Sequence, residues 1–589
     1  GNLYLPKNIG DKKLPGILYV CGHGAVKKDG ISYGNKVHYQ HHGGWYARNG
    51  YVCLTIDSLQ LGEIEALHHG TYREGMWWWN SRGYTPAGVE AWNCIRALDY
   101  LQSRPEVDPD QLGVTGRSGG GAYSWWIAAT DERIKAAVPT AGITDLENHV
   151  VDGKVEGHCD CMFMVNTYRW DYPQVAALVA PRPLLISNSD KDPIFPLEGV
   201  VRTHARTRRV YDLLGAGKNL GLQITEGGHE DTQELHIHAF RWFNRFFKND
   251  KSPITIAAEP FFTPEQLKVF TELPADQINT RIQETFGPTA PPPAVPETAG
   301  DFRKERERVL AALGEKTFRG WPSEGGLLDV KPVFSAEHNG IRLSAYDFTS
   351  QPEIELRLYV AQRAGLAPKD LDLVVLNALD EPGWNKFLAT YRPAFTEELK
   401  DEPLPEANAE EFESTQKMFG AFKWGMAYLA PRGIGRSAWD QTPKKQVQIR
   451  RRFMLLGQTL PGMQVWDVRR AVQALRGLEG FSVVPVWLQG EDSMAPVVLY
   501  ASLFEPNIAR LDLWRLPTTH LEGPDFLNVL RILDVPEAVA LAGERSKVRI
   551  YQNSDGGWEY PQAVAGKLGW DPKQIQVRVV TPAEVTEQT

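Results

Sequence analysis

Val114-Thr115-Gly116-Arg117-Ser118-Gly119-Gly120-Gly121 links a short apolar segment, residues 112–115, to the apolar run 122–129. This pattern predicts a strand, a sharp turn that carries Ser118 and a helix, an arrangement called a nucleophile elbow. A serine at such a turn has strained backbone angles, and Gly116 and Gly120 leave room for close approach of the neighbouring chain. The first N–H groups of the helix then point toward Ser118 and can stabilise an oxyanion formed there. Ser118 is therefore a candidate nucleophile.

Length and composition restrict the class of protein. With 589 residues the chain is too long for one ordinary hydrophobic core, so two or three domains are expected. It has 64 Lys and Arg against 73 Asp and Glu, a net charge of −9, which argues against a nucleic-acid partner and against an anionic membrane. No run of about 18 uninterrupted apolar residues occurs, so no transmembrane helix is expected. Residues 1–5 are already typical of a strand, which suggests a segment upstream of residue 1.

Apolar runs alternate with helical periodicity throughout the first 250 residues. Residues 89–101 have helical spacing of their apolar positions, and residues 122–129 are also expected to form a helix. This alternation predicts an α/β fold with a mostly parallel sheet and helices on both faces. The runs expected to form strands are 16–21, 51–57, 112–115, 135–140, 182–188 and 222–225.

Two of the later predicted strands are followed by residues that can activate a serine. Active-site residues of parallel α/β sheets lie at the carboxyl ends of strands. Asp190 and Asp192 follow run 182–188, and His229 follows run 222–225. His229 can take the proton of Ser118 and return it to a leaving group, while an acid orients the imidazole. We assign the acid to Asp192 and keep Asp190 as the alternative.

Four motifs carry a resemblance to a known family. They are Cys21-Gly22-His23-Gly24, Gly116-Arg117-Ser118-Gly119-Gly120, Asp192-Pro193-Ile194-Phe195-Pro196 and Gly227-Gly228-His229. With them, residues 1–250 resemble an α/β-hydrolase of the acetyl xylan esterase and dienelactone-hydrolase-like group. The resemblance implies ester hydrolysis through an acyl-enzyme, no cofactor, and carbohydrate esters as substrates. The related glucuronoyl esterases place an arginine after the serine, whereas Arg117 precedes Ser118, so that arginine's role is not carried over.

Further residues are candidates for binding the reacting ester. The backbone N–H groups of Gly119 and Ala25 are the expected oxyanion donors, since this kind of hydrolase supplies the second donor from a turn after an early strand. Tryptophan faces suit sugar rings, although they also pack loops onto the body of a protein. The candidate substrate-binding side chains are Trp77, Trp78, Trp79, Arg117 and His23.

The sequence predicts no metal site. His158-Cys159-Asp160-Cys161 contains metal-binding residue types, but its spacing is too compressed for a closed tetrahedral zinc site unless other segments add ligands. The pairs His41-His42 and His68-His69 match no recognisable set of ligands. The five cysteines are odd in number and form no disulfide framework.

The second half of the chain repeats part of the first. A stiff, proline-rich stretch, residues 287–296, lies in a predicted linker over 251–330 and precedes a second domain over 331–589. Trp466 lies 374 residues after Trp92, and at this same offset Gly490 corresponds to Gly116. Ser118 then corresponds to Asp492, and neither His338 nor His520 follows the last strand predicted in this half, residues 548–551. We interpret this half as a degenerate α/β-hydrolase-like domain without a triad.

These observations favour a serine carboxylester hydrolase acting on a carbohydrate ester, in the manner of an acetyl xylan esterase. Glucuronoyl and feruloyl esters stay open as substrates. The alternatives are a serine peptidase of the prolyl-oligopeptidase type, against which the lack of a recognisable β-propeller counts, and a non-catalytic binding protein. A polysaccharide substrate would favour a secreted or periplasmic location. The acyl group, the sugar and assembly into a homo-oligomer stay open.

Overall fold

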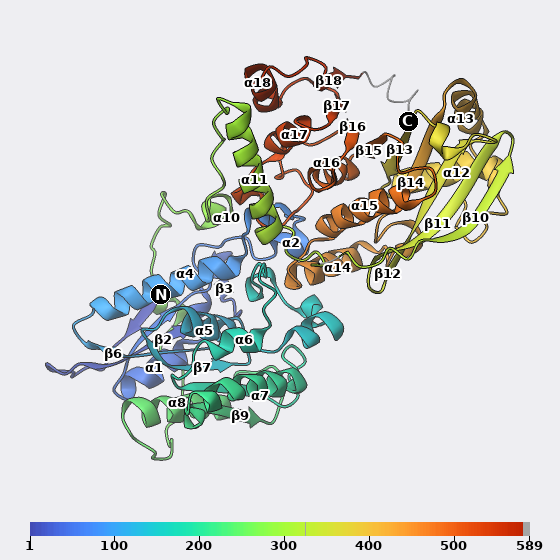
Figure 1. The fold of residues 1–589 in the computed structure, drawn as a ribbon. Coiled ribbons are helices and arrows are strands. Elements are labelled where there is room, and N and C mark those ends of the chain that lie inside the picture. The colour runs from blue at the N-terminus through green and yellow to red at the C-terminus, as the bar shows by residue number, and fades with distance from the viewer. Residues whose placement is uncertain (324, 581–589) are drawn as a thin grey trace. The chain divides into compact units, whose positions relative to one another are not determined.

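The chain forms two compact units in the computed structural model, which describes residues 1–323 and 325–580 (Figure 1). The first unit contains residues 1–76 and 84–287, and the second contains residues 77–83 and the chain from Pro288 onward. The boundary at residue 287 falls inside the segment 251–330, which the sequence analysis assigned to a linker.

The first unit contains a seven-stranded sheet in the order β1-β5-β2-β6-β7-β8-β9. Only β1 is antiparallel to its neighbour, and the other strands are parallel. A separate two-stranded hairpin is formed by β3 (Lys27–Lys28) and β4 (Ile31–Ser32). The strands of the main sheet are β1 (Asn2–Tyr4), β2 (Leu14–Val20), β5 (Val52–Ile56), β6 (Val107–Arg117), β7 (Ile134–Thr140), β8 (Leu184–Ser189) and β9 (Leu220–Thr225).

Helices cover both faces of this sheet. On one face, α1 (Gln40–Arg48) and α8 (Gln233–Phe247) pack together, with the rings of Trp45 and Phe240 stacked at 3.5 Å between centroids. The other face carries α4 (Pro86–Ser103), α5 (Gly119–Thr130), α6 (Tyr172–Ala177) and α7 (Leu197–Leu213). Shorter helices are α2 (Gly70–Arg73), α9 (Pro264–Leu267) and α10 (Ile282–Thr285).

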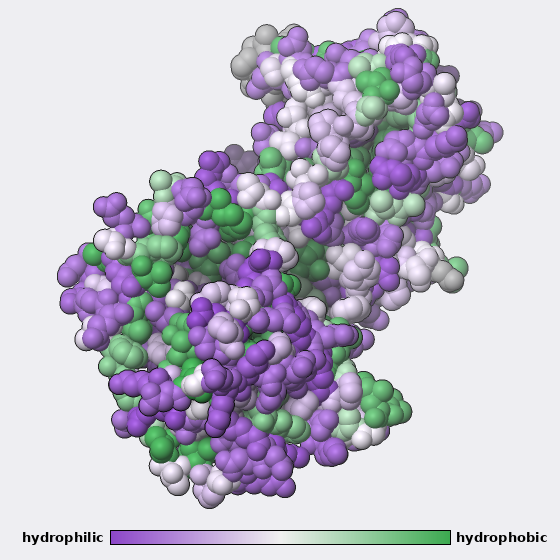
Figure 2. Space-filling view, turned by 90° about the vertical axis from the view of Figure 1, so that its left-hand side faces the viewer, coloured by the Kyte–Doolittle hydropathy of each residue, from purple (hydrophilic) through white to green (hydrophobic). Residues whose placement is uncertain are grey.

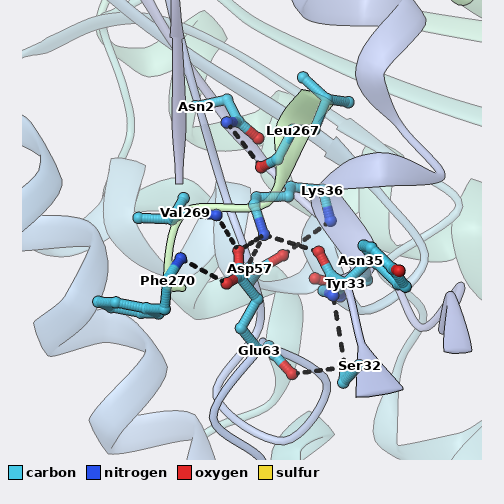
Figure 3. Close-up of polar contacts among 12 residues, drawn as sticks. Asn2, Ser32, Tyr33, Asn35, Lys36, Asp57, Glu63, Leu267, Val269 and Phe270 are labelled. Atoms are coloured by element: carbon cyan, nitrogen blue, oxygen red, sulfur yellow. Dashed lines mark hydrogen bonds and ion pairs between the residues drawn. The ribbon is translucent and has the colours of Figure 1, made fainter. Parts of the chain in front are cut away.

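A buried lysine forms ion pairs with two carboxylates of the segment that follows β5 (Figure 3). Lys36 is fully buried, and its Nζ lies 3.1 Å from Oδ2 of Asp57 and 2.7 Å from Oε1 of Glu63. The Glu63 carboxylate also accepts the backbone N–H groups of Val269 and Phe270, at 2.8 and 2.9 Å. Each charge is therefore paired, as burial requires. The network joins three segments that are distant in sequence.

The second unit contains a nine-stranded sheet in the order β10-β11-β12-β14-β13-β15-β16-β17-β18. The first four strands in this order are antiparallel to one another, and the strands from β14 to β18 are parallel. The strands are β10 (Lys331–His338), β11 (Ile341–Gln351), β12 (Ile354–Arg363), β13 (Leu373–Ala378), β14 (Trp424–Leu429), β15 (Val486–Glu491), β16 (Ile508–Trp514), β17 (Lys547–Gln552) and β18 (Ile575–Val579).

The helices of the second unit pack on its sheet in two groups. One group is α12 (Glu381–Phe395) with α13 (Ala409–Ala421), which contact β10 and β12. The other is the row α15 (Leu460–Gly477), α16 (Met494–Phe504) and α17 (Val535–Gly543). The remaining helices are α3 (Trp78–Arg82), α11 (Ala299–Lys316), α14 (Pro443–Leu455) and α18 (Glu559–Lys567).

The two sheets share the order and direction of seven strands. The order β1-β5-β2-β6-β7-β8-β9 corresponds to β12-β14-β13-β15-β16-β17-β18, and in each case the first strand is antiparallel to the second. The bounds of α4 and α15, and of β7 and β16, differ by the same 374 residues that separate Trp92 from Trp466. The predicted α/β fold with two mostly parallel sheets flanked by helices is confirmed.

Hydrophilic side chains cover most of the face drawn in Figure 2, and hydrophobic ones form smaller groups between them. This distribution is ordinary for a folded protein, whose surface always retains some apolar area. Within residues 1–323 and 325–580, no helix combines the length and apolar character needed to cross a membrane.

Candidate active site

Ser118 occupies a strained turn between β6 and α5. Its φ of 58° and ψ of −120° lie in a region that residues with a side chain rarely adopt. The Ser118 N–H donates to the carbonyl of Thr140 in β7 at 2.9 Å. A Cβ atom on Gly120 would lie 1.9 Å from the carbonyl oxygen of Val20, so only glycine fits there. The packing of β6, α5 and β2 thus holds Ser118 at the end of its strand.

His229 connects this serine to a buried carboxylate. Its Nε2 lies 2.9 Å from Oγ of Ser118, and its Nδ1 lies 2.6 Å from Oδ2 of Asp192. In this arrangement Ser118 donates to the imidazole, and the Nδ1–H donates to the carboxylate. The three residues follow β6, β8 and β9, so the parallel sheet brings together side chains that are far apart in sequence.

Asp192 is held in its ionised form. It is 3 % exposed, and its Oδ1 accepts the backbone N–H groups of Ile194 and Phe195 at 2.8 and 3.0 Å. Burial alone would raise the pKa of Asp192, but the hydrogen bonds from His229 and the two N–H groups outweigh burial and keep that pKa below its ordinary value. Asp190, the alternative acid, is exposed and accepts the Gly227 N–H at 2.8 Å instead.

A cluster of three histidines anchors the loop that carries His229. Asp231 lies two residues after His229, and its carboxylate is 3.1 and 3.2 Å from Nε2 of His41 and His42 in α1. Nε2 of His236, in α8, lies 2.9 Å from the other oxygen of this carboxylate. The sequence offered no recognisable set of metal ligands for His41 and His42, and it did not identify Asp231 and His236 as their neighbours. Their partners come from a loop and a helix nearly 200 residues away in the sequence.

The expected oxyanion donors lie in two segments near Ser118. Gly119 is the first residue of α5, so its N–H has no acceptor within the helix. A Cβ atom on Gly119 would lie 2.6 Å from Nε2 of His23, which places the His23 ring directly beside the elbow. Ala25 follows in the same loop as His23 and is exposed. The donor role of both N–H groups stays a prediction.

The predicted substrate-binding residues occupy different environments. Residues 77–83 pack with the second unit, where the ring of Trp77 lies 3.7 Å from the guanidinium carbon of Arg450. Trp79 is 1 % exposed, whereas Trp78 is partly exposed. Arg117 is 8 % exposed. Substrate binding by Trp77, Trp78, Trp79, Arg117 and His23 stays a prediction.

The second unit repeats the elbow without its chemistry. Asp492, which corresponds to Ser118, has a φ of 47°, and its N–H donates to the carbonyl of Trp514 at 3.0 Å. Its two carboxylate oxygens accept Nε and an Nη of Arg515 at 2.6 and 2.8 Å. Both oxygens of Asp492 are therefore engaged in a bidentate ion pair, as in a structural carboxylate.

Part of the first unit matches a family of known proteins. Residues 45–250 match the family described as the prolyl oligopeptidase family. The Bacillus subtilis protein named Putative hydrolase YtaP is 28 % identical over 198 residues, which cover 33 % of this chain and 65 % of YtaP. Uncharacterized peptidase YuxL, also from Bacillus subtilis, is 31 % identical over 143 residues, 20 % of this chain and 21 % of YuxL. This chain thus spans less than two thirds of the length of these relatives.

Solved structures are similar at lower identity. A putative acetyl xylan esterase from Bacteroides fragilis aligns with 49 % of this chain and 78 % of its own, at 13 % identity and a TM-score of 0.38. A carbohydrate esterase family 15 glucuronoyl esterase from Caldicellulosiruptor kristjansonii aligns with 44 % of this chain and 76 % of its own, at 20 % identity and a TM-score of 0.32. The sheet order and the elbow give the first unit the fold of an α/β-hydrolase, and residues 45–250 match the prolyl oligopeptidase family.

Proposed function

We propose that this protein is a serine carboxylester hydrolase whose substrate is a carbohydrate ester, in particular an acetyl ester of a polysaccharide. The hydrogen-bonded series Ser118–His229–Asp192 carries the proposal, because its two contacts of 2.9 and 2.6 Å provide a nucleophile, a base and an orienting acid. The match to a hydrolase family over residues 45–250 supports a serine hydrolase. The choice of ester rests on the motif resemblance around Cys21, Ser118, Asp192 and His229.

The proposed reaction begins with attack of Ser118 Oγ on the ester carbonyl. His229 Nε2 takes the serine proton, and Asp192 stabilises the resulting imidazolium through Nδ1–H. Two backbone N–H groups donate to the oxyanion of the tetrahedral intermediate. They are the Gly119 N–H, which has no acceptor within its helix, and the N–H of Ala25. His229 then protonates the sugar oxygen as its bond to the carbonyl carbon breaks, so the sugar leaves as an alcohol and an acyl-enzyme remains on Ser118. Water activated by the same imidazole releases the acid and restores the serine.

A serine peptidase is the second candidate. The matched family description and the relative named as a peptidase favour it, and the same three side chains would serve amide hydrolysis. The nitrogen expelled from an amide is a much stronger base than the alkoxide oxygen expelled from a sugar ester, so amide cleavage depends more on protonation by His229. The two candidates therefore differ in which leaving groups the enzyme accepts.

A panel of substrates distinguishes the candidates. Aryl acetates, acetylated xylan, methyl glucuronates, feruloyl esters and aminoacyl amides are given to the wild type and to Ser118→Ala. Hydrolysis of acetylated xylan and aryl acetates, lost in Ser118→Ala, is the expected result. Turnover of aminoacyl amides without turnover of acetyl esters would support the peptidase. Ester turnover that survives in Ser118→Ala would contradict both candidates.

A further inference from the structure

Two cysteines and two histidines from three separate segments meet beside the elbow. His23 lies in the loop after β2, His68 lies just before α2, and Cys159 and Cys161 flank Asp160 at the start of a short 3₁₀ helix (Asp160–Met162). One donor atom from each of the four side chains lies within 4.8 Å of all the others. Cys159 is 7 % exposed and Cys161 is fully buried.

We propose that His23, His68, Cys159 and Cys161 bind one zinc ion. Two thiolates with two imidazoles form a donor set that suits tetrahedral Zn²⁺ and not hard cations such as Mg²⁺ or Ca²⁺. Zinc–nitrogen and zinc–sulfur bonds of about 2.0 and 2.3 Å place neighbouring tetrahedral ligands roughly 3.3 to 3.8 Å apart. Cys159 Sγ lies 3.8 Å from Nδ1 of His23, and Cys161 Sγ lies 3.5 Å from Nε2 of the same ring. Each sulfur thus lies at the expected ligand–ligand distance from one nitrogen of the His23 ring, and the ion would bind one of these two nitrogens.

Hydrogen bonds outside the four donors hold the segments in place. The Asp160 carboxylate accepts the N–H and the hydroxyl of Thr71 at 2.8 and 2.6 Å, and the Tyr72 N–H at 3.2 Å. The turn that contains the two cysteines is therefore fastened to α2, directly after His68. The rings of His23 and His68 meet edge to face, with 4.8 Å between centroids. Bracing of this kind is what metal ligands require from their surroundings.

The other histidine cluster of the first unit has an explanation that needs no ion. There, the three imidazoles around Asp231 lie 2.9 to 3.2 Å from a charged acceptor, and each makes a strong hydrogen bond. Thiols, in contrast, are weak donors and weak acceptors, so hydrogen bonding alone accounts poorly for two cysteines gathered around two imidazoles.

The proposed zinc has a structural role. Four protein ligands close a tetrahedral site and leave no position for water or substrate. The ion would join three segments: the loop of His23, the segment of His68 and the turn with the two cysteines. The His23 ring lies beside Gly119, the residue that follows Ser118. The ion would hold these segments in place beside Ser118 without taking part in acyl transfer.

Metal analysis of the full chain tests the site. The protein is purified without a histidine tag, dialysed against zinc-free buffer and analysed by plasma mass spectrometry. We expect about one zinc per chain in the wild type and near zero in the double variant Cys159→Ser/Cys161→Ser. Cys94→Ala, at a buried cysteine in α4, is the matched control and should retain the zinc. His236→Ala should also retain it, because His236 belongs to the Asp231 cluster.

Cobalt substitution tests the ligand set in the wild type, without relying on a variant that folds. Co²⁺ bound by two thiolates in a tetrahedral site gives thiolate charge-transfer absorption and intense visible bands. Weak bands of six-coordinate Co²⁺, a wild type with no zinc, or zinc that persists in the double cysteine variant but disappears in His236→Ala would each overturn the proposal.

Discussion

Asp190 and Asp192 are two residues apart in sequence, but their carboxylates accept hydrogen bonds from different groups. Asp192 accepts from His229, whereas Asp190 accepts from the Gly227 N–H. We expect Asp192→Asn to lower kcat by about 10³- to 10⁴-fold, because the amide cannot stabilise the imidazolium and favours the wrong tautomer. Asp190→Asn, the matched control, should retain kcat within about one order of magnitude, since it removes only a loop hydrogen bond. Steady-state kinetics on an aryl acetate measures both, and equal losses in the two variants would contradict the assignment.

The sequence predicted Ser118, Asp192 and His229 because each follows a recognisable apolar run, and the ends of parallel strands must meet at one edge. Asp231 and the group His23, His68, Cys159 and Cys161 were not predicted as clusters. Their members lie in loops and on helix surfaces, where spacing in sequence says nothing about separation in space. The available signals were the doublets His41-His42 and His68-His69 and the Cys-x-Cys spacing, and none of them identifies its partners.

At the scale of the element, the buried Lys36 ties the segment after β5 to the rest of the first unit. Lys36→Met leaves the buried Glu63 and the partly buried Asp57 without a counter-charge, so we expect it to lower the free energy of unfolding of this unit by about 3 to 5 kcal/mol. Urea unfolding followed by tryptophan fluorescence measures the loss. Lys28→Met, which removes an exposed ion pair with Glu265, is the matched control and should leave stability nearly unchanged.

The triple variant Lys36→Met/Asp57→Asn/Glu63→Gln completes this test. It removes all three charges, so most of the stability lost in Lys36→Met should return if the loss came from uncompensated charge. A triple variant less stable than Lys36→Met would show that packing or hydrogen-bond geometry, and not charge pairing, dominates at this position.

The stability of the first unit should depend on pH through the ionisation of Asp231, whose carboxylate anchors the loop that carries His229. Burial alone would raise the pKa of Asp231, but the charge of His42 and the hydrogen bonds from His236, His41 and His42 outweigh burial and hold that pKa far below its ordinary value. A lowered pKa contributes stability above the unfolded value of about 3.9, and this contribution is lost as pH falls toward the folded value. Asp231→Asn should therefore lower Tm most at neutral pH, with the difference from wild type narrowing below about pH 4.

Differential scanning calorimetry of wild type and Asp231→Asn across this pH range measures the effect. A Tm difference that stays constant from neutral to acid pH would mean that Asp231 acts through packing and not through its charge.

Element prediction succeeded where hydrophobic patterning was strong. The apolar runs of β2, β5, β7 and β8 are continuous because both faces of these strands are buried, and the sequence placed each of them. It did not predict β10, β11 and β12, the antiparallel strands of the second unit. β10 is largely exposed, so polar residues interrupt the apolar pattern that identifies a strand.

At the scale of the whole molecule, two units share a sheet order, but among the described residues only the first unit places a serine, a histidine and an aspartate in hydrogen-bond contact at the elbow. The second elbow places Asp492 in a bidentate ion pair with Arg515, and the two histidines of residues 288–580 are engaged elsewhere, His338 with Glu398 and His520 with Tyr500. We expect Asp492→Asn to retain kcat/KM for esters within about twofold, since a nucleophile without a base contributes little. Steady-state kinetics beside Ser118→Ala checks this. A loss comparable to that of Ser118→Ala would reveal a second active centre.

Labelling with a fluorophosphonate tests the central claim most directly. The probe reacts with a serine only where a base has activated its hydroxyl, so it reports the Ser118–His229 contact in solution. Mass spectrometry of the labelled, digested wild type should find one adduct per chain, on the peptide that contains Ser118, and no adduct in Ser118→Ala or His229→Ala. A wild-type chain that stays unlabelled, or one labelled equally in His229→Ala, would contradict the account.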